Sequence, residues 1–163
     1  MRFAYADPPY PGQARKLYRC PEIDHRILIN SLELEYPDGW ALSTSSSALR
    51  SVLALCPDDV RIAAWVKPFA SFKPGINPAY TWEPVIWRGG RPRARGEDTA
   101  RDHLAENITL QKGLCGAKPP AFNRWILELL GYRPGEDTLD DLFPGTGGMG
   151  RAILELEGQR RLG

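Results

Sequence analysis

The sequence predicts an α/β fold built on a mostly parallel sheet. Short apolar runs typical of buried strands alternate along the chain with apolar stripes at helical spacing, which is the order expected of an α/β domain. The first strand-like run ends in a proline turn, and the last one leads through a glycine-rich turn into a helix. With 163 residues, the chain is long enough to bury the core of a single domain over residues 1–163.

The first half of the chain alternates regularly between the two patterns. Asp24 is a typical N-cap for the first helix, and the turn residues Pro37-Asp38-Gly39 end it. Leu49, Val52 and the residues that continue their stripe fall on one face of a second helix. The expected elements are a strand at 2–6, a helix at 24–36, a strand at 40–44, a helix at 49–56 and a strand at 60–66.

The second half contains a less regular segment. A strand is expected at 83–87, and residues 88–118 have no clear period, so we expect an irregular basic insert there with a short helix near 100–108. A strongly amphipathic helix follows over 122–130 and ends at Gly131, a typical C-cap. The last expected elements are a strand at 138–142 and a helix at 149–156.

Composition excludes several classes of protein. The net charge of +1 does not indicate nucleic-acid binding by bulk charge. No apolar run approaches the roughly 18 residues of a membrane helix, and the N-terminus lacks the pattern of a signal peptide, so we expect a cytoplasmic protein without membrane contact. The three cysteines and two histidines are far apart, which argues against a metal site and fits a reducing compartment.

The first strand ends in Asp7-Pro8-Pro9-Tyr10. Prolines end strands, so a turn accounts for Pro8 and Pro9. A turn does not require an aspartate before the prolines or a tyrosine after them. These two side chains are therefore candidates for chemistry.

The last strand runs into Asp141-Leu-Phe-Pro-Gly-Thr-Gly-Gly-Met-Gly150. Glycines allow positive φ and close approach of a ligand, and the N–H groups at the start of the next helix can bind an anion. A tight turn that needs glycine for packing is the alternative. Both turns follow strands, so both should lie at the carboxyl edge of the sheet, where open α/β sheets bind ligands. If the first and last strands are neighbours, the two turns face one crevice.

The two motifs together resemble the S-adenosylmethionine-dependent amino-methyltransferases, which methylate adenine N6 or cytosine N4. Asp7-Pro8-Pro9-Tyr10 looks like their catalytic motif, and Lys118-Pro119 with the helix after it resembles the segment before their cofactor motif. The resemblance spans most of the chain, apart from about residues 88–115, and implies a Rossmann-like class I methyltransferase sheet with S-adenosylmethionine as cofactor. The cofactor contacts that it implies are Asp7, Lys118, Asp141, Phe143, Pro144, Gly145, Thr146, Gly147 and Gly148.

The resemblance also gives the catalytic motif a chemical role. The Asp7 carboxylate can accept one N–H of an aromatic amine, and the backbone carbonyl of Pro8, as the family implies, can accept the other. Both prolines stiffen the turn, and Tyr10 can stack on a base held out of its helix. The expected reaction is methyl transfer to an exocyclic amine of a nucleobase, foremost adenine N6 in DNA. Cytosine N4 and RNA are alternatives, and so is a non-catalytic subunit that binds nucleic acid beside a partner.

The catalytic motif precedes the cofactor motif, which is the permuted order of the β-class DNA methyltransferases and the RNA N6-adenine enzymes. In the β class the segment between the two motifs carries target recognition. Guanidinium and ammonium groups suit phosphate contacts, and the candidates here are Arg88, Arg91, Arg93, Arg95 and Lys112. A solvated loop is the alternative. Trp82 and Trp87 could stack on bases or pack in the core.

The chain departs from the family after the cofactor motif. In the full family form two more strands follow, and an acid at the end of the first one binds the ribose. The sequence predicts a minimal, permuted sheet without these strands. Ribose contacts are then expected from residues 103–118, for example Asn107 or Gln111, or from a second chain in a homodimer or a partner subunit.

Overall fold

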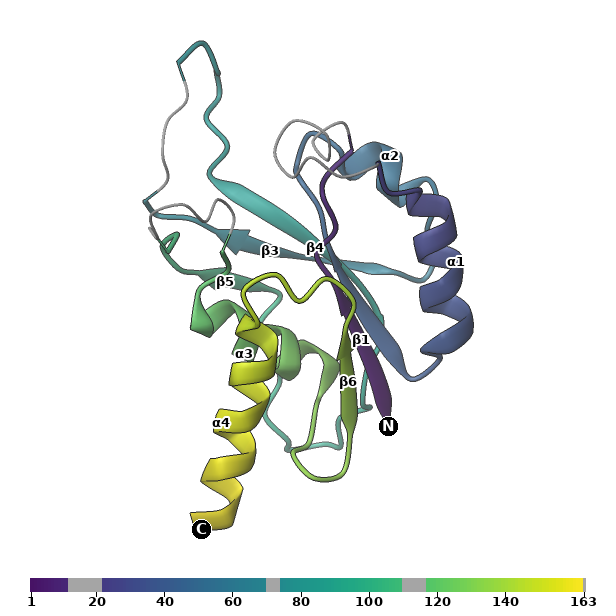
Figure 1. Ribbon diagram of the computed structural model, residues 1–163, viewed down its shortest axis with the longest axis vertical. Coiled ribbons are helices and arrows are strands. Elements are labelled where there is room, and N and C mark those ends of the chain that lie inside the picture. Colours follow the sequence, from purple (N-terminus) through teal and green to yellow (C-terminus); the bar gives the residue numbers. More distant parts are fainter. Residues whose placement is uncertain (12–21, 70–73, 110–116, 163) are drawn as a thin grey trace.

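A computed structural model describes residues 1–11, 22–69, 74–109 and 117–162. One six-stranded sheet carries helices on both of its faces (Figure 1). The strands are β1 (Arg2–Ala6), β2 (Gly39–Ser43), β3 (Arg61–Val66), β4 (Trp82–Gly89), β5 (His103–Ala105) and β6 (Thr138–Asp141). The helices are α1 (His25–Glu35), α2 (Leu49–Leu53), α3 (Pro120–Leu130) and α4 (Gly148–Leu162).

The strand order is β5-β3-β4-β2-β1-β6. β1 pairs in parallel with β2 and with β6, and β5 pairs in parallel with β3. β4 is antiparallel to both of its neighbours. The prediction of a mostly parallel sheet is confirmed, with β4 as the reversed strand. Five strands therefore end, and β4 begins, at one edge of the sheet, which we call the carboxyl edge; the opposite edge is the amino edge.

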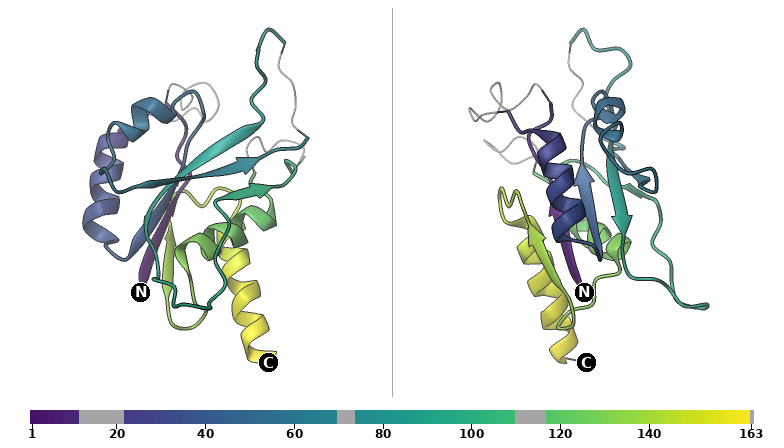
Figure 2. Two further views of the ribbon diagram at one scale, coloured as in Figure 1. Left: turned by 180° about the vertical axis from the view of Figure 1, so that it is seen from behind. Right: turned by 90° about the vertical axis from the view of Figure 1, so that its right-hand side faces the viewer.

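Alternation along the strands divides the core between the two faces. Phe3 and Tyr5 pack against α3 and α4, whereas Ala4 and Ala6 face the cluster that contains residues of α1 and α2. Figure 2 shows the two pairs of helices on opposite sides of the sheet. All four of these strand residues are buried, so β1 is a central strand that fixes the position of whatever follows it.

Two helix boundaries follow the predicted capping. The Asp24 side chain accepts hydrogen bonds from the N–H groups of Arg26 and Ile27 at the start of α1. Gly131 ends α3 with a φ of 67°, in the left-handed region. α2 is shorter than the sequence predicts and ends at Leu53, and α4 is longer, reaching Leu162.

The helix expected near 100–108 is wrong, because His103–Ala105 forms β5 instead. Backbone hydrogen bonds run from Ala64 N to Asp102 O at 2.9 Å and from Glu106 N to Val66 O at 3.0 Å. Pairing satisfies an N–H group and a carbonyl group on the outer side of β3 that would otherwise lack partners. This tertiary requirement outweighs the local helical preference of the segment.

In the described part of the chain, no helix combines the length and the apolar character needed to cross a membrane.

Candidate active site

Pairing of β1 with β6 brings the two sequence motifs together at the carboxyl edge. Tyr5 lies opposite Asp141, and Leu142 N donates a 2.9 Å hydrogen bond to Tyr5 O. The turn that begins at Asp7 and the glycine-rich loop that begins at Leu142 therefore leave adjacent strands side by side (Figure 1). The expectation that the first and last strands are neighbours is confirmed.

A chain of alternating charges fills this edge on the α3 face of the sheet. Lys118, just before α3, places its Nζ 3.1 Å from Asp7 Oδ2 and 3.1 Å from Glu83 Oε2. Lys67, which follows β3, forms an ion pair with the other oxygen of Glu83. All four side chains are mostly buried. Because each carboxylate has a cation beside it, the burial of these charges is compensated.

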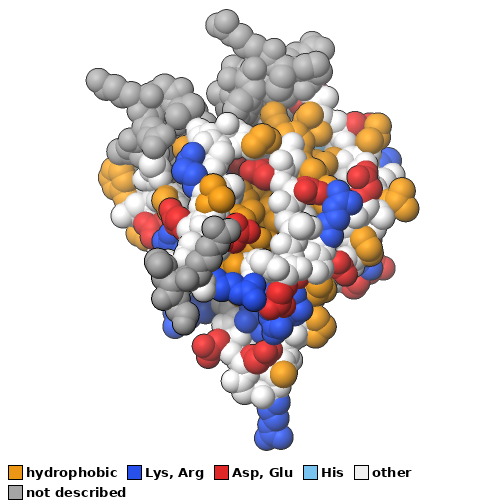
Figure 3. Space-filling model, turned by 60° about the horizontal axis from the view of Figure 1, so that its bottom comes forward, with side chains coloured by type: hydrophobic (Ala, Val, Ile, Leu, Met, Phe, Trp, Pro, Cys, Tyr) orange, Lys and Arg blue, Asp and Glu red, His pale blue; other side chains and the backbone are white. Residues whose placement is uncertain are grey.

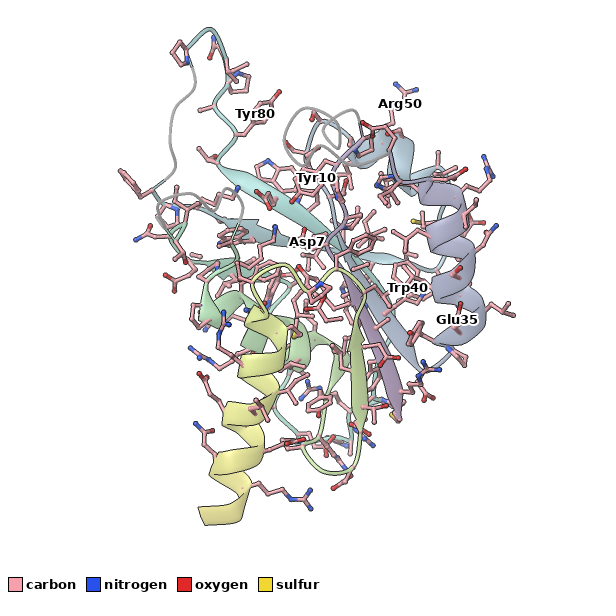
Figure 4. All side chains as sticks on the ribbon, viewed as in Figure 1. Asp7, Tyr10, Glu35, Trp40, Arg50 and Tyr80 are labelled. Carbon is pink, nitrogen blue, oxygen red and sulfur yellow. The ribbon has the colours of Figure 1, made fainter. Side chains whose placement is uncertain are left out.

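Tyr10 joins the same network through its hydroxyl. The phenol donates a 2.8 Å hydrogen bond to Glu83 Oε2, and Lys118 Nζ donates a 3.3 Å hydrogen bond to the phenol oxygen. Figure 4 shows Asp7 and Tyr10 following one another at the carboxyl edge. The sequence assigned a role only to the ring of Tyr10, whereas the structure gives its hydroxyl a structural role as well.

Aromatic rings surround the Lys118 ammonium. Its Nζ lies 5.6 Å from the ring centroids of both Trp65 and Phe122 and 5.8 Å from that of Tyr10. Trp65 and Phe122 pack against each other with centroids 5.2 Å apart. Ring faces attract a cation at this range, so Lys118 is held in place from several sides and in turn fixes Asp7.

The two carboxylates differ in their ionisation. Burial raises the pKa of Asp7 above its usual value, although Lys118 works in the opposite direction. Burial would also raise the pKa of Glu83, but Lys118 and Lys67 together lower it to about 2. Burial would lower the pKa of Lys118, and Asp7 with its other neighbours raises it well above the usual value. Glu83 and Lys118 thus stay charged, and Asp7 is the carboxylate with the greater proton affinity.

The glycine-rich loop is open where a ligand would lie. Gly145 has a φ of 47° and Gly147 a φ of 73°, so both positions favour glycine through backbone conformation. A Cβ added at Gly147 would meet only Arg151 Nη1 at 3.6 Å, and one at Gly145 only Phe143 O at 3.8 Å. Protein packing therefore leaves space in front of these two glycines.

Gly148 and Gly150 behave differently from the first two glycines. A Cβ at Gly148 would lie 2.7 Å from Nδ2 of Asn123, so packing excludes a side chain there. A Cβ at Gly150 would meet nothing within 4 Å. The alternative reading of the motif as a packing turn thus applies to Gly148 and not to Gly145, Gly147 or Gly150.

Asn123 is a buried polar residue of α3 beside the first turn of α4. The residue is 3% exposed, and its side-chain amide has no hydrogen-bond partner among the described residues. An open glycine loop, a helix N-terminus and a buried amide with unused hydrogen-bonding capacity together suit a ligand with polar groups. Asp141, the last residue of β6, lies where the glycine-rich loop begins, and its Oδ1 accepts a 3.3 Å hydrogen bond from Phe143 N. These residues fit the cofactor that the sequence predicts.

The predicted nucleic-acid contacts do not join this site. β4 runs from the carboxyl edge to the amino edge, so the segment after Arg88 leaves the sheet at the far end from Asp7. Arg88 pairs with Glu33 and Asp59, each at 2.7 Å. Figure 3 brings forward the end of the molecule where β1 begins and shows blue and red side chains side by side.

Two further arginines of this segment also form hydrogen bonds within the protein. Arg91 contacts both oxygens of Asp137 at 2.6 and 2.7 Å, and Arg93 donates to the carbonyls of Asp98 and Glu128. Phosphate contacts by Arg88, Arg91 and Arg93 stay a prediction, one that requires these side chains to leave their present partners. Arg95 is exposed.

The remaining residues singled out from the sequence lie in three places. Trp87 is buried in the core, where the guanidinium of Arg61 lies 3.7 Å from its ring centroid. The side chain of Asn107 accepts a 3.0 Å hydrogen bond from Phe69 N. Lys112 and Gln111 lie outside the described residues.

Sequence reasoning missed Glu83, Lys67 and Asn123. The available signal was the position of charged residues at the ends of two apolar strands that meet at one edge. For Asn123 the signal was a short polar side chain within the apolar stripe of a helix, between Phe122 and Ile126. Neither signal shows that these residues belong to the site unless the directions of the strands are known.

Searches by sequence find no match to a family model and none to a curated protein. Solved structures do match. The chain superposes on M1.HpyAVI in complex with SAM with a TM-score of 0.66 at 16% identity, over 96% of this chain and 78% of that one. The chain has the fold of the amino-methyltransferases. A second structure of M1.HpyAVI gives a TM-score of 0.61 at 18% identity, over 95% and 76% of the two chains. The predicted Rossmann-like methyltransferase sheet is confirmed.

Proposed function

We propose that this protein transfers a methyl group from S-adenosylmethionine to the exocyclic amine of a nucleobase, and that the acceptor is adenine N6 in DNA. The observation that carries the proposal is the juxtaposition of Asp7 with the open glycine loop across the β1–β6 pair. An acceptor for amine N–H groups and a ligand cradle then share one edge of the sheet. M1.HpyAVI, which has the same fold and was solved in complex with SAM, supports this choice of cofactor.

Asp7 prepares the amine for reaction. An aromatic amine is a weak nucleophile because its lone pair is delocalised into the ring. The Asp7 carboxylate accepts one amine N–H and the Pro8 carbonyl accepts the other, which directs the nitrogen lone pair out of the ring plane. Lys118, 3.1 Å from the Asp7 carboxylate, holds that acceptor in one position. Positioning of this kind accounts for a large part of the rate acceleration.

The cofactor fits the glycine loop on the neighbouring strand. Asp141, residues 143–148 and Asn123 would hold it, with the start of α4 directed at its polar groups. S-adenosylmethionine supplies an electrophilic methyl group on a sulfonium. The raised pKa of Asp7 makes this carboxylate the nearby group best able to take the proton that the amine releases.

Tyr10 holds the base beside Asp7. Its hydroxyl is tied to Glu83 and Lys118, so the ring has a fixed orientation at the rim of the site. A fixed ring presents a face on which an unstacked base can lie. The rings of Trp65 and Phe122 lie deeper and hold Lys118.

The direct test is an assay with labelled S-adenosylmethionine. The protein is incubated with unmethylated genomic DNA and, separately, with RNA, and the nucleosides are then separated. We expect label in N6-methyldeoxyadenosine. Label in N4-methyldeoxycytidine or in RNA would keep the reaction and change the acceptor. Tight cofactor binding with no transfer to any nucleic acid would favour the non-catalytic subunit.

A further inference from the structure

We propose that residues 75–82, which lead into β4, form with Ser46 a second base-binding site, which holds an unstacked nucleobase next to the one that is methylated. This inference rests on the proposed function, because it assumes a nucleic-acid substrate. It places the main contacts with nucleic acid on residues 75–82 and Ser46 at the carboxyl edge, and not on the arginine segment at the amino edge.

The connection lies on the same side of the molecule as Asp7. β3 ends and β4 begins at the carboxyl edge, so the chain between them leaves and returns there. Figure 1 shows the described parts of this connection projecting beyond the sheet. Figure 4 places Tyr80 of the connection beyond the same edge of the sheet as Tyr10 and Asp7.

The connection exposes large apolar side chains that the fold does not use. Phe69 is 57% exposed, Tyr80 51% and Ile76 41%. Exposed aromatic and aliphatic side chains near a candidate active site are a typical feature of a binding surface. Stacking on bases is one interaction that such groups supply irrespective of sequence.

A pocket of about 290 Å³ lies between this connection and the segment that leads into α2. Tyr80 and Trp82 contribute two aromatic rings to its lining, and Ser46 and Asn77 contribute a hydroxyl and an amide. Rings can stack on a base, and a hydroxyl and an amide can pair with the donors and acceptors on its edge. The chemical class that fits this lining is a nucleobase.

The pocket and the active site lie on opposite faces of one strand end. Trp82 and Glu83 are consecutive on β4, and side chains of a strand alternate between faces. Glu83 belongs to the network with Asp7 and Lys118, whereas Trp82 lines the pocket. A nucleic-acid strand that crosses the carboxyl edge would therefore present neighbouring nucleotides to the two sites.

The charge around the pocket is compatible with phosphate. Residues 74–82 include no acidic residue. Arg50 in α2 lies four residues after Ser46, is exposed and has no side-chain partner among the described residues. Figure 4 shows its side chain extending from the molecule near α2. In contrast, Arg88 and Arg91 at the amino edge are paired with carboxylates.

The test compares five variants in two sets. Tyr80→Ala removes a ring of the pocket, Tyr80→Phe keeps it, and Leu34→Ala on α1, where the side chain is 83% exposed, controls for the loss of an exposed apolar group. Arg50→Ala removes the proposed phosphate contact, and Arg95→Ala removes an exposed arginine on the far side. The measurements are KM for DNA, the affinity for a fluorescent DNA oligonucleotide of random sequence, Kd for S-adenosylmethionine, and thermal stability.

We expect Tyr80→Ala to raise KM for DNA at least about five-fold, which corresponds to the lower end of measured base–aromatic stacking. Kd for the cofactor and the melting temperature should stay unchanged, and Tyr80→Phe should resemble the wild type. Arg50→Ala should weaken oligonucleotide binding and reduce its salt dependence. Leu34→Ala should leave both KM and oligonucleotide binding unchanged, and Arg95→Ala, in the segment for which the sequence predicts phosphate contacts, should weaken oligonucleotide binding less than Arg50→Ala.

Four results would overturn the inference. The first is methylation by the wild type with an unchanged KM for DNA in Tyr80→Ala. The second is an equal loss of cofactor binding in that variant, and the third is a changed oligomeric mass, which would mark the pocket as a protein interface. The fourth is cofactor binding by the wild type without binding or methylation of any nucleic acid, which would remove the proposed acceptor together with this site.

Discussion

Asp7 is the side chain on which the proposed chemistry depends. Burial raises its pKa, which means that the fold disfavours its charged form. We therefore predict that Asp7→Ala lowers methyl transfer at least about 100-fold, a typical cost of lost positioning, without lowering the free energy of unfolding. Single-turnover assays and urea unfolding measure the two quantities. A matched control is Asp59→Ala, at an exposed carboxylate on the far side of the sheet. A rate near that of the wild type in Asp7→Ala would mean that another group accepts the amine N–H.

The pH dependence of the reaction should depend on the contact between Asp7 and Lys118. Asp7 accepts an N–H only when ionised, so the rate should fall as the pH falls through its pKa, and this pKa is raised. Lys118 opposes that shift. We predict that Lys118→Gln raises the pKa of Asp7 further and moves the acid limb of the kcat profile to higher pH. A limb that stays in place or moves to lower pH would show that Lys118 does not control the ionisation of Asp7.

Glu83 should contribute to acid stability. Its pKa is lowered to about 2 in the folded protein from an ordinary value of 4.5. An acid with a depressed pKa stabilises the fold above its unfolded pKa, and this contribution is lost as the pH falls from about 4.5 to about 2. We predict that Glu83→Gln is less stable than the wild type at pH 7 and that the difference narrows across this window. Urea unfolding at several pH values measures it, and a difference that widens towards low pH would contradict the prediction.

Glu83 and Asp7 also show what the sequence could and could not predict. A turn explains the prolines of the motif but not its aspartate, so the sequence alone indicates that Asp7 belongs to the site. Glu83 lies more than 70 residues away and acquires its role only through contact with Lys118 and Lys67. That contact depends on the direction of β4. Nothing in the local pattern of β4 indicates that it runs against its neighbours.

The loop between β6 and α4 offers a test within one structural element. Gly147 has a left-handed backbone conformation, whereas Gly150 is helical and faces open space. We predict that Gly150→Ala keeps cofactor binding and raises the free energy of unfolding by about 0.5–1 kcal/mol, the usual gain of alanine over glycine in a helix. Gly147→Val should weaken cofactor binding more than it lowers the stability of the protein without cofactor. Calorimetric titration and thermal unfolding separate the two effects, and equal damage to both by Gly147→Val would favour a packing role.

The helices and most strands were predictable because each has a local signal. Asp24 and Gly131 are capping residues, and both cap as expected. β5 was not predictable in this way. Its three residues have no strand pattern of their own and become a strand only because β3 offers backbone groups that lack partners.

β6 is an outer strand of the sheet in the part of the chain that the structure describes. An open edge of a sheet is usually covered by other polypeptide, and small-molecule sites usually bury most of their ligand. We predict that a second copy of the chain or a partner subunit lies beside β6 and encloses the cofactor. Light scattering with and without S-adenosylmethionine tests this. A strict monomer that binds the cofactor tightly would exclude the homodimer.

Pairing of β1 with β6 also determines at which point of its synthesis the chain becomes able to bind the cofactor. Arg2 pairs with Thr138, so almost the whole described chain separates the two strands. A ribosome produces the Asp7 turn more than a hundred residues before the glycine loop. Until β6 emerges, one side of β1 stays unpaired and the cofactor has no cradle to bind. The nascent chain therefore gains no stability from the cofactor during synthesis, and the unpaired side of β1 is a site for aggregation that only completion of the sheet removes.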